Sequence, residues 1–149
     1  HPQGLQVVSS VSLPALRALQ ADCVAGPTIG ADPIIAGLVL TSGYSGNGIN
    51  GLIVRKEVKN HGMSKMIEGE LNRGSRVVIV DDTCSTGGSL IKAIEVIEDQ
   101  GCIVAGVLTI LDRNMGGREK ITKRGYKFAS ILKVDSSEKI FASFYSTPL

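Results

Sequence analysis

The sequence predicts an α/β fold with a central, mostly parallel sheet flanked by helices. Apolar, β-branched runs typical of buried strands alternate along the chain with segments of helical periodicity. Strands that are joined through helices run parallel, with right-handed crossovers. The chain carries no internal repeat, low-complexity tract or linker, so residues 1–149 are predicted to form a single domain.

The individual elements follow from these runs. Strands are expected at residues 22–26, 52–55, 77–80, 103–111 and 128–134. Helices are expected at residues 34–40, 90–97 and 118–124, with a terminal turn or helix at 139–145. Residues 1–21 have helical spacing in part, and Pro14 is predicted to kink that helix or to divide it into two pieces.

Composition indicates an ordinary globular protein. Hydrophobic residues make up 43% of the chain and charged residues 20%, which is typical of soluble domains. The net charge of +2 gives no reason to expect nucleic acid or a membrane surface as a partner, and no apolar run approaches the ~20 residues of a membrane span. The three cysteines lack metal-ligand spacing, so a reduced, cytoplasmic protein is expected.

Residues 77–89 carry the most informative pattern. A β-branched strand is followed by two acids, Asp81 and Asp82, and then by a small, hydroxyl-rich loop that leads into a helix. Amides of such a loop and of a helix N-terminus bind phosphate, while the acids would serve hydroxyls or a cation. The alternative is that the two acids only end the strand and cap the helix. The complete pattern favours a ligand site at the carboxyl edge of the sheet.

Two other glycine-rich turns have weaker signals. Residues 26–33 follow a strand and precede a helix, so they are a candidate ligand loop, although a plain turn fits equally well. Residues 46–51 match the dinucleotide fingerprint G-x-G-x-x-G, but they lead into a strand instead of opening a helix. This second segment is therefore predicted to be a surface turn.

Residues 55–65 form an unusually basic segment, with four Lys or Arg residues and a histidine among eleven residues. Composition alone is typical of a solvated loop. The segment follows a strand, however, so it is expected at the same sheet edge as the phosphate loop. Cations on a loop can close over a polyanion and exclude water during a reaction.

These motifs resemble those of a known family. Residues 77–89 are similar to the phosphoribosyl diphosphate (PRPP) signature of type I phosphoribosyltransferases. Residues 55–62 resemble the catalytic-loop pattern Arg-Lys-x-x-Lys-x-His-Gly of orotate phosphoribosyltransferases. Residues 26–33 and 111–113 also look like segments of that family. The resemblance covers residues 22–113 and implies a type I phosphoribosyltransferase-like fold with a flexible loop after an early strand.

The resemblance implies an enzyme of pyrimidine (UMP) biosynthesis. It would transfer the phosphoribosyl group of PRPP to orotate, giving orotidine monophosphate (OMP) and diphosphate. Mg²⁺ would be the cofactor, held mainly through PRPP with no direct protein ligand. A homodimer is implied, in which loop 55–65 acts in trans on the neighbouring subunit's site.

The resemblance also implies roles for particular residues. The catalytic residues would be Lys59, His61, Asp81 and Asp82. PRPP would be bound by Arg55, Lys56, Lys59, His61, Asp81, Asp82, Thr83, Cys84, Ser85, Thr86, Gly87, Gly88 and Ser89. Orotate would be bound by Ser85 and Arg113, where the guanidinium suits a carboxylate. The alternative for Arg113 is a surface salt bridge with Asp112 or Glu119.

Several alternatives stay open at this point. The chain could serve another nucleobase, or it could be a PRPP-sensing regulator, although a regulator should show a basic face. Cys84 could have a lowered pKa near a helix N-terminus, or simply be a small loop residue. Family members carry an N-terminal hood over the base, and this sequence is expected to begin after it. The first loop also has Ile29-Gly-Ala where some members have a lysine.

Overall fold

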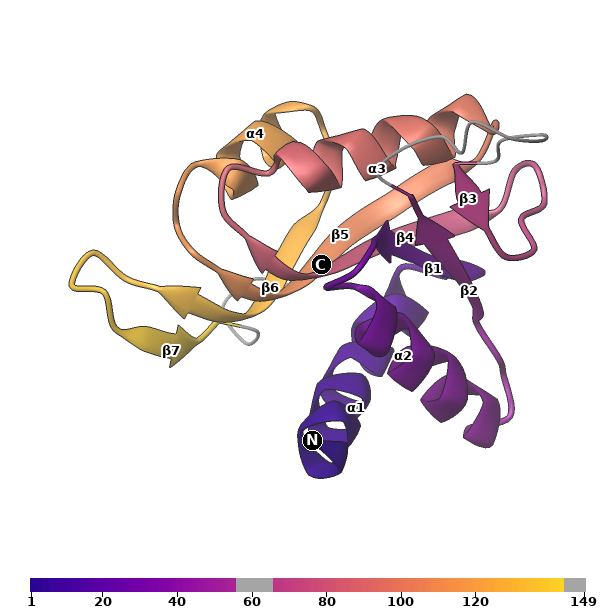
Figure 1. Ribbon diagram of the computed structural model, residues 1–149, viewed down its shortest axis with the longest axis horizontal. Helices are drawn as coiled ribbons and strands as arrows, with labels where there is room; N and C mark the ends of the chain where they lie inside the picture. The colour runs from indigo at the N-terminus through magenta and orange to yellow at the C-terminus, as the bar shows by residue number, and fades with distance from the viewer. Residues whose placement is uncertain (56–65, 144–149) are drawn as a thin grey trace.

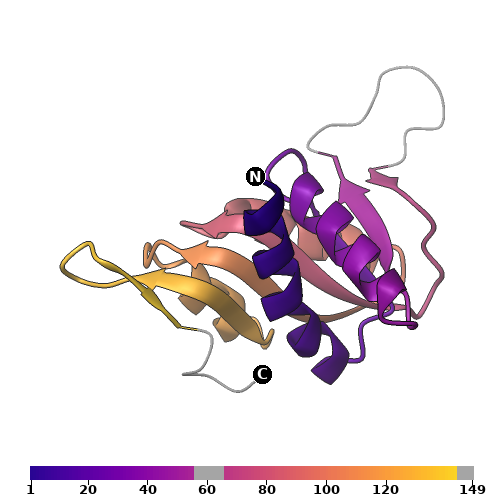
Figure 2. The same cartoon turned by 90° about the horizontal axis from the view of Figure 1, so that it is seen from below.

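The computed structural model describes residues 1–55 and 66–143. These residues form a seven-stranded sheet with helices on both faces (Figures 1 and 2). The strands are β1 (Cys23–Pro27), β2 (Asn50–Val54), β3 (Ile67–Glu68), β4 (Arg76–Cys84), β5 (Ile103–Asp112), β6 (Phe128–Val134) and β7 (Ile140–Ala142). The helices are α1 (Pro2–Ala18), α2 (Asp32–Tyr44), α3 (Gly88–Asp99) and α4 (Gly117–Lys123).

The sheet has the order β3-β2-β1-β4-β5-β6-β7 and is mostly parallel. The five strands from β2 to β6 in this order pair in parallel, whereas β3 and β7 pair antiparallel with their neighbours at the two edges. The predicted α/β fold class is therefore confirmed. The parallel arrangement brings the carboxyl ends of β1, β4 and β5 to one edge of the sheet.

Two hydrophobic cores hold the layers together. Helices α1 and α2 cover one face, where Leu16 and Leu38 pack with Val78 of β4. Helix α3 covers the other face, where Ile94 packs with Ile79 of the same strand. Strand β4 is thus buried on both sides, which explains why its sequence is a continuous apolar run rather than an alternating one.

Pro14 does not divide the first helix. The structure has one continuous helix, α1, with Pro14 inside it. Proline removes the hydrogen bond that would reach the carbonyl of Ser10, and both Pro14 and Ser10 lie on the exposed side of the helix. Water can therefore satisfy that carbonyl, so the helix tolerates the proline.

The expectation of a turn or helix at 139–145 was wrong. Strand β7 instead pairs antiparallel with β6, while residues 144–149 lie outside the described residues. The carboxylate of Asp135 accepts hydrogen bonds from the backbone N–H groups of Ser137 and Lys139, at 2.8 and 2.9 Å, and so closes the hairpin turn.

The short strand β3 at the other edge of the sheet was also not predicted. Both edge strands are too short to have a clear period.

The glycine-rich segment 46–51 leads from α2 into β2 and does not open a helix, as predicted. Among the described helices, none has the length and apolar character needed to cross a bilayer.

Candidate functional site

The loops after β1 and β4 face each other across a cavity of about 380 Å³ at the carboxyl edge of the sheet. The cavity is lined by Pro27, Thr28, Ile29, Gly30, Asp81, Asp82, Thr83, Ser85, Thr86, Gly87, Gly88 and Ser89. Two of the segments singled out in the sequence, 26–33 and 77–89, are therefore brought together. This edge is where open α/β sheets bind their ligands.

The acidic pair belongs to the strand itself. Strand β4 continues through both acids to Cys84 instead of ending at Val80. Side chains of a strand alternate between its two faces, so Asp81 is buried, with 6% of its surface exposed, while Asp82 is exposed. The backbone N–H of Asp82 donates to Oδ1 of Asp81 at 2.9 Å, and the Ser89 hydroxyl donates to Oδ2 at 3.5 Å.

The two acids have different environments. The pKa of Asp81 is raised to about 6. Burial is the largest cause and the neighbouring Asp82 carboxylate contributes to the rise, while the hydrogen bonds from the Asp82 amide and the Ser89 hydroxyl oppose it. The Asp82 carboxylate accepts only the Thr83 hydroxyl, at 3.3 Å, among the described residues. Asp82 is thus the member of the pair with a carboxylate open to the cavity.

The loop 83–89 ends in an open helix N-terminus. Gly87 precedes α3 with a φ of 78°, a left-handed conformation that glycine adopts without strain. Among the described side chains, none makes a capping bond at this terminus, so the proposal that Asp81 and Asp82 cap the helix is wrong. Gly88 and Ser89 line the cavity, and the free N–H groups of the first turn suit an anion there.

Gly117 contacts this loop through its backbone, and the sequence analysis did not identify it as a site residue. Its N–H donates to the carbonyl of Ser85 at 2.9 Å. A Cβ at residue 117 would stand 2.6 Å from that carbonyl oxygen and 2.8 Å from the Gly87 nitrogen. The only sequence signal is the Gly116-Gly117 pair at the start of α4. The sequence alone cannot show that the start of α4 packs against the loop after β4, which is why glycine is needed at residue 117.

Cys84 does not have the environment of a reactive thiol. Its side chain is 1% exposed and is not part of the cavity lining. Burial raises the pKa of the thiol to about 11, and the charges of Asp112 and Asp81 add to the effect. The hypothesis of a lowered pKa is therefore wrong, and a contact of Cys84 with PRPP stays a prediction. The thiol fills space beside Gly117.

Arg113 stands next to the phosphate loop. It follows β5, and its backbone N–H donates to the carbonyl of Cys84 at 2.9 Å. Its side chain is exposed and forms no ion pair with Asp112 or Glu119 in the described structure. The surface salt bridge considered from the sequence is therefore not formed.

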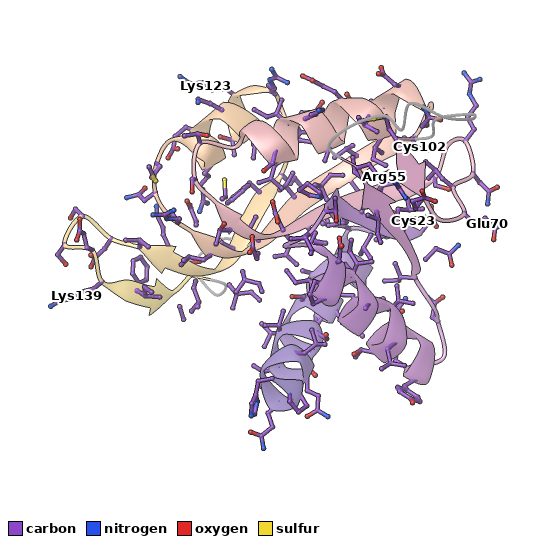
Figure 3. The ribbon with its side chains drawn as sticks, viewed as in Figure 1. Cys23, Arg55, Glu70, Cys102, Lys123 and Lys139 are labelled. Atoms are coloured by element: carbon purple, nitrogen blue, oxygen red, sulfur yellow. The ribbon has the colours of Figure 1, made fainter. Side chains whose placement is uncertain are left out.

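The basic segment is described only at its first residue. Arg55 pairs with Glu68 of β3 at 2.6 Å. It lies on the β2 side of the molecule, remote from Lys139 in the β6–β7 hairpin (Figure 3). Lys56, Lys59 and His61 lie outside the described residues.

Comparison with known proteins identifies the family. Residues 50–141 match the model of the phosphoribosyl transferase domain. The chain is 38% identical to the orotate phosphoribosyltransferase of Aquifex aeolicus, over 89% of this chain and 73% of that protein. It is also 38% identical to that of Pyrococcus abyssi, over 90% of this chain and 72% of that protein.

A solved structure gives the same result. The orotate phosphoribosyltransferase of Mycobacterium tuberculosis in complex with PRPP superimposes with a TM-score of 0.80 at 30% identity, covering 90% of this chain and 75% of that one. Sequence and fold therefore indicate the same family. The chain belongs to the orotate phosphoribosyltransferase family.

Proposed function

We propose that this chain transfers the phosphoribosyl group of PRPP to orotate, releasing diphosphate and forming OMP for pyrimidine synthesis. The observation that carries the proposal is the cavity in which Asp81 and Asp82 face the loop Thr28–Gly30 beside an open helix N-terminus. PRPP has the matching parts. It combines a ribose phosphate with vicinal hydroxyls and a diphosphate.

Each part of PRPP has a counterpart in the cavity. The backbone amides and hydroxyls of residues 83–89 would hold the ribose phosphate, since an anion is stabilised by the N-terminus of α3. The carboxylates of Asp82 and Asp81 would accept hydrogen bonds from the ribose hydroxyls. The pKa of Asp81 is raised to about 6, so at neutral pH its carboxyl group would be mostly ionised and both of its oxygens would be acceptors.

The chemistry requires positioning and neutralisation of charge more than covalent participants. In this family the ribose carbon loses diphosphate before the bond to the base has fully formed, so positive charge develops on the sugar and negative charge on the leaving group. Lys59 and His61, with Arg55 and Lys56, would neutralise the diphosphate. His61 could also protonate one of its oxygens, because the unperturbed pKa of histidine lies near neutrality.

Magnesium fits the residues present. Among the described residues there is no group of three or more His, Cys, Asp or Glu side chains that could hold a metal. Mg²⁺ keeps several waters and is commonly bound through one or two carboxylates together with substrate phosphates. Here PRPP would hold the ion, and Asp82 and Asp81 would contact the ribose hydroxyls or the waters of the ion and not the metal itself. When bound, it would offset the charge of the leaving diphosphate.

The base would be held on the β5 side of the cavity. We assign orotate to Arg113 and Ser85, since a guanidinium can bind a carboxylate through two parallel hydrogen bonds. The free, exposed side chain of Arg113 beside the loop supports this assignment.

We extend the proposal to the assembly. The chain would act as one domain and as a cytoplasmic homodimer, with the basic loop of each subunit reaching the partner's site. Cytoplasmic placement is consistent with the absence of disulfides among the three buried cysteines.

The direct test is orotate consumption, followed by ultraviolet absorbance, with the purified chain, PRPP and Mg²⁺. We expect a loss of orotate that requires both the sugar diphosphate and the metal. Adenine and uracil offered in place of orotate test the alternative nucleobases. Turnover of either at the expense of orotate would contradict the proposal, and binding of PRPP with no turnover of any base would favour a regulator.

A further inference from the structure

Asp112 is an unexpectedly buried carboxylate beside the site. It ends β5 and is only 1% exposed. Its Oδ1 atom accepts the backbone N–H of Asn114 at 2.9 Å, whereas Oδ2 has no hydrogen-bond partner among the described residues. Burying a carboxylate with an unsatisfied oxygen is costly, so a role for this residue is expected.

The bond to Asn114 closes a turn around Arg113. An aspartate that accepts the N–H two residues later forms an Asx-turn. Asn114 has a φ of 57°, a left-handed conformation that asparagine tolerates better than most residues. The backbone N–H of Arg113 donates to the carbonyl of Cys84 at 2.9 Å, and the N–H of the next residue, Asn114, donates to the Asp112 carboxylate. The backbone of Arg113 is therefore fixed on both sides.

This turn is also fastened to the phosphate loop at its far end. The N–H of Gly117 donates to the carbonyl of Ser85 at 2.9 Å. Residues 113–117 are thus tied to residues 84–85 at two points, with the exposed Arg113 side chain at the first of them. The direction in which this side chain leaves the backbone depends on the turn that Asp112 closes.

We propose that Asp112 is a positioning residue for the base. Its carboxylate holds the turn that directs Arg113 toward the orotate carboxylate, and it touches no substrate itself because it is buried. This inference rests on the proposed function, since it requires orotate as the base and Arg113 as its contact.

The test compares two ligands by calorimetry, OMP and ribose 5-phosphate. Only OMP carries the base, so the ratio of the two affinities reports the contacts to the base, of which Arg113 would make one. We expect Asp112→Ala to weaken OMP binding roughly three- to tenfold, the effect of one lost hydrogen bond, with ribose 5-phosphate unaffected. Asp112→Asn keeps the Oδ1 acceptor and should bind both ligands as the wild type does.

A double-mutant cycle separates positioning from other effects. Arg113→Ala should weaken OMP binding by itself, and adding Asp112→Ala should cause no further loss, because both changes remove the same interaction. If the Asp112→Ala chain does not fold, Asp112→Val, which fills the space without an acceptor, takes its place.

Other outcomes would overturn the inference. If Asp112→Ala weakened the binding of OMP and of ribose 5-phosphate equally, Asp112 would only support the phosphate loop. An Asn variant as weak as the Ala variant would exclude the hydrogen bond as the cause. If Arg113→Ala bound OMP normally, both this inference and the assignment of the base to Arg113 would fall. Failure of the proposed function alone would give a different result. The wild type would then bind OMP normally but would not turn over orotate.

Discussion

A Cβ atom at residue 30 would stand 2.8 Å from the Cγ atom of Asp82. Gly30 belongs to the loop after β1, and Asp82 to the end of β4, so the two loops that line the cavity meet at this pair. Real Cβ atoms almost never come this close to another heavy atom. Glycine is therefore required at residue 30 if the Asp82 carboxylate is to keep its position.

Gly30→Ala is expected to weaken PRPP binding roughly tenfold, because the Asp82 carboxylate, the flexible end of an exposed side chain, would move away from the new methyl group and lose its hydrogen bonds to the ribose. The Asp82 carboxylate would have to move out of the cavity. Isothermal calorimetry with PRPP and Mg²⁺ measures the effect. Gly48→Ala is the matched control, since a Cβ there would meet nothing within 4 Å. Equal PRPP affinity in the two variants would show that Asp82 can be displaced without consequence.

Asp82→Asn is expected to lower PRPP affinity about tenfold or more, since hydrogen bonds to a charged group contribute more than neutral ones. The melting temperature should not change, because Asp82 is exposed and accepts only the Thr83 hydroxyl among the described residues. Asp99→Asn, at the exposed far end of α3, removes the same charge as a control. A large drop in the melting temperature of the Asp82 variant would instead indicate a structural role.

Asp81 is expected to make stability depend on pH. Burial raises its pKa in the folded chain from 3.8 to about 6, so between these values the folded state binds more protons than the unfolded state. The free energy of unfolding should therefore fall as pH rises from 4 to 6, by an amount on the order of 2 kcal/mol from this group. The loss is complete above the folded pKa.

Asp81→Asn isolates this effect, since it keeps an acceptor for the Asp82 amide but cannot ionise. Urea unfolding of both chains from pH 4 to pH 7 gives the comparison. The stability of the variant relative to the wild type should increase across the range. Parallel curves would mean that Asp81 is solvated well enough to titrate normally.

The site features that depend on neighbouring residues in the chain could be predicted from the sequence, whereas those that depend on tertiary contacts could not. The acidic pair and the loop 83–89 were found because a strand, two acids and small residues follow one another directly. That Asp81 is buried and Asp82 exposed needed only the alternation of β4 to be continued past Val80. Gly117, by contrast, contacts Ser85 and Gly87, some thirty positions away in the chain, and no local period reveals such contacts.

The three cysteines should react slowly with Ellman's reagent in the folded chain. Cys23, Cys84 and Cys102 are each less than 10% exposed, and burial raises the pKa of the first two to about 11, so little thiolate is available. Labelling in denaturant should give all three thiols. Fast labelling of one thiol in the native chain, slowed by PRPP, would restore the hypothesis of a lowered pKa at Cys84.

Lys59→Ala is expected to lower turnover about a hundredfold, the typical effect of removing one group that stabilises developing negative charge. The melting temperature should stay the same. Lys139→Ala, in the hairpin at the other end of the molecule from Arg55 (Figure 3), is the control for loss of one lysine. Normal turnover by the Lys59 variant would rule out its catalytic assignment.

The same variant tests whether the loop acts in trans. If each site combines Asp82 of one subunit with Lys59 of the other, a mixed dimer of Lys59→Ala and Asp82→Asn subunits contains one complete site. Mixing the two weakly active variants and allowing their subunits to exchange should therefore restore part of the activity. If the loop serves its own subunit, every site in the mixed dimer carries one of the two substitutions. Activity should then remain at the average of the two variants.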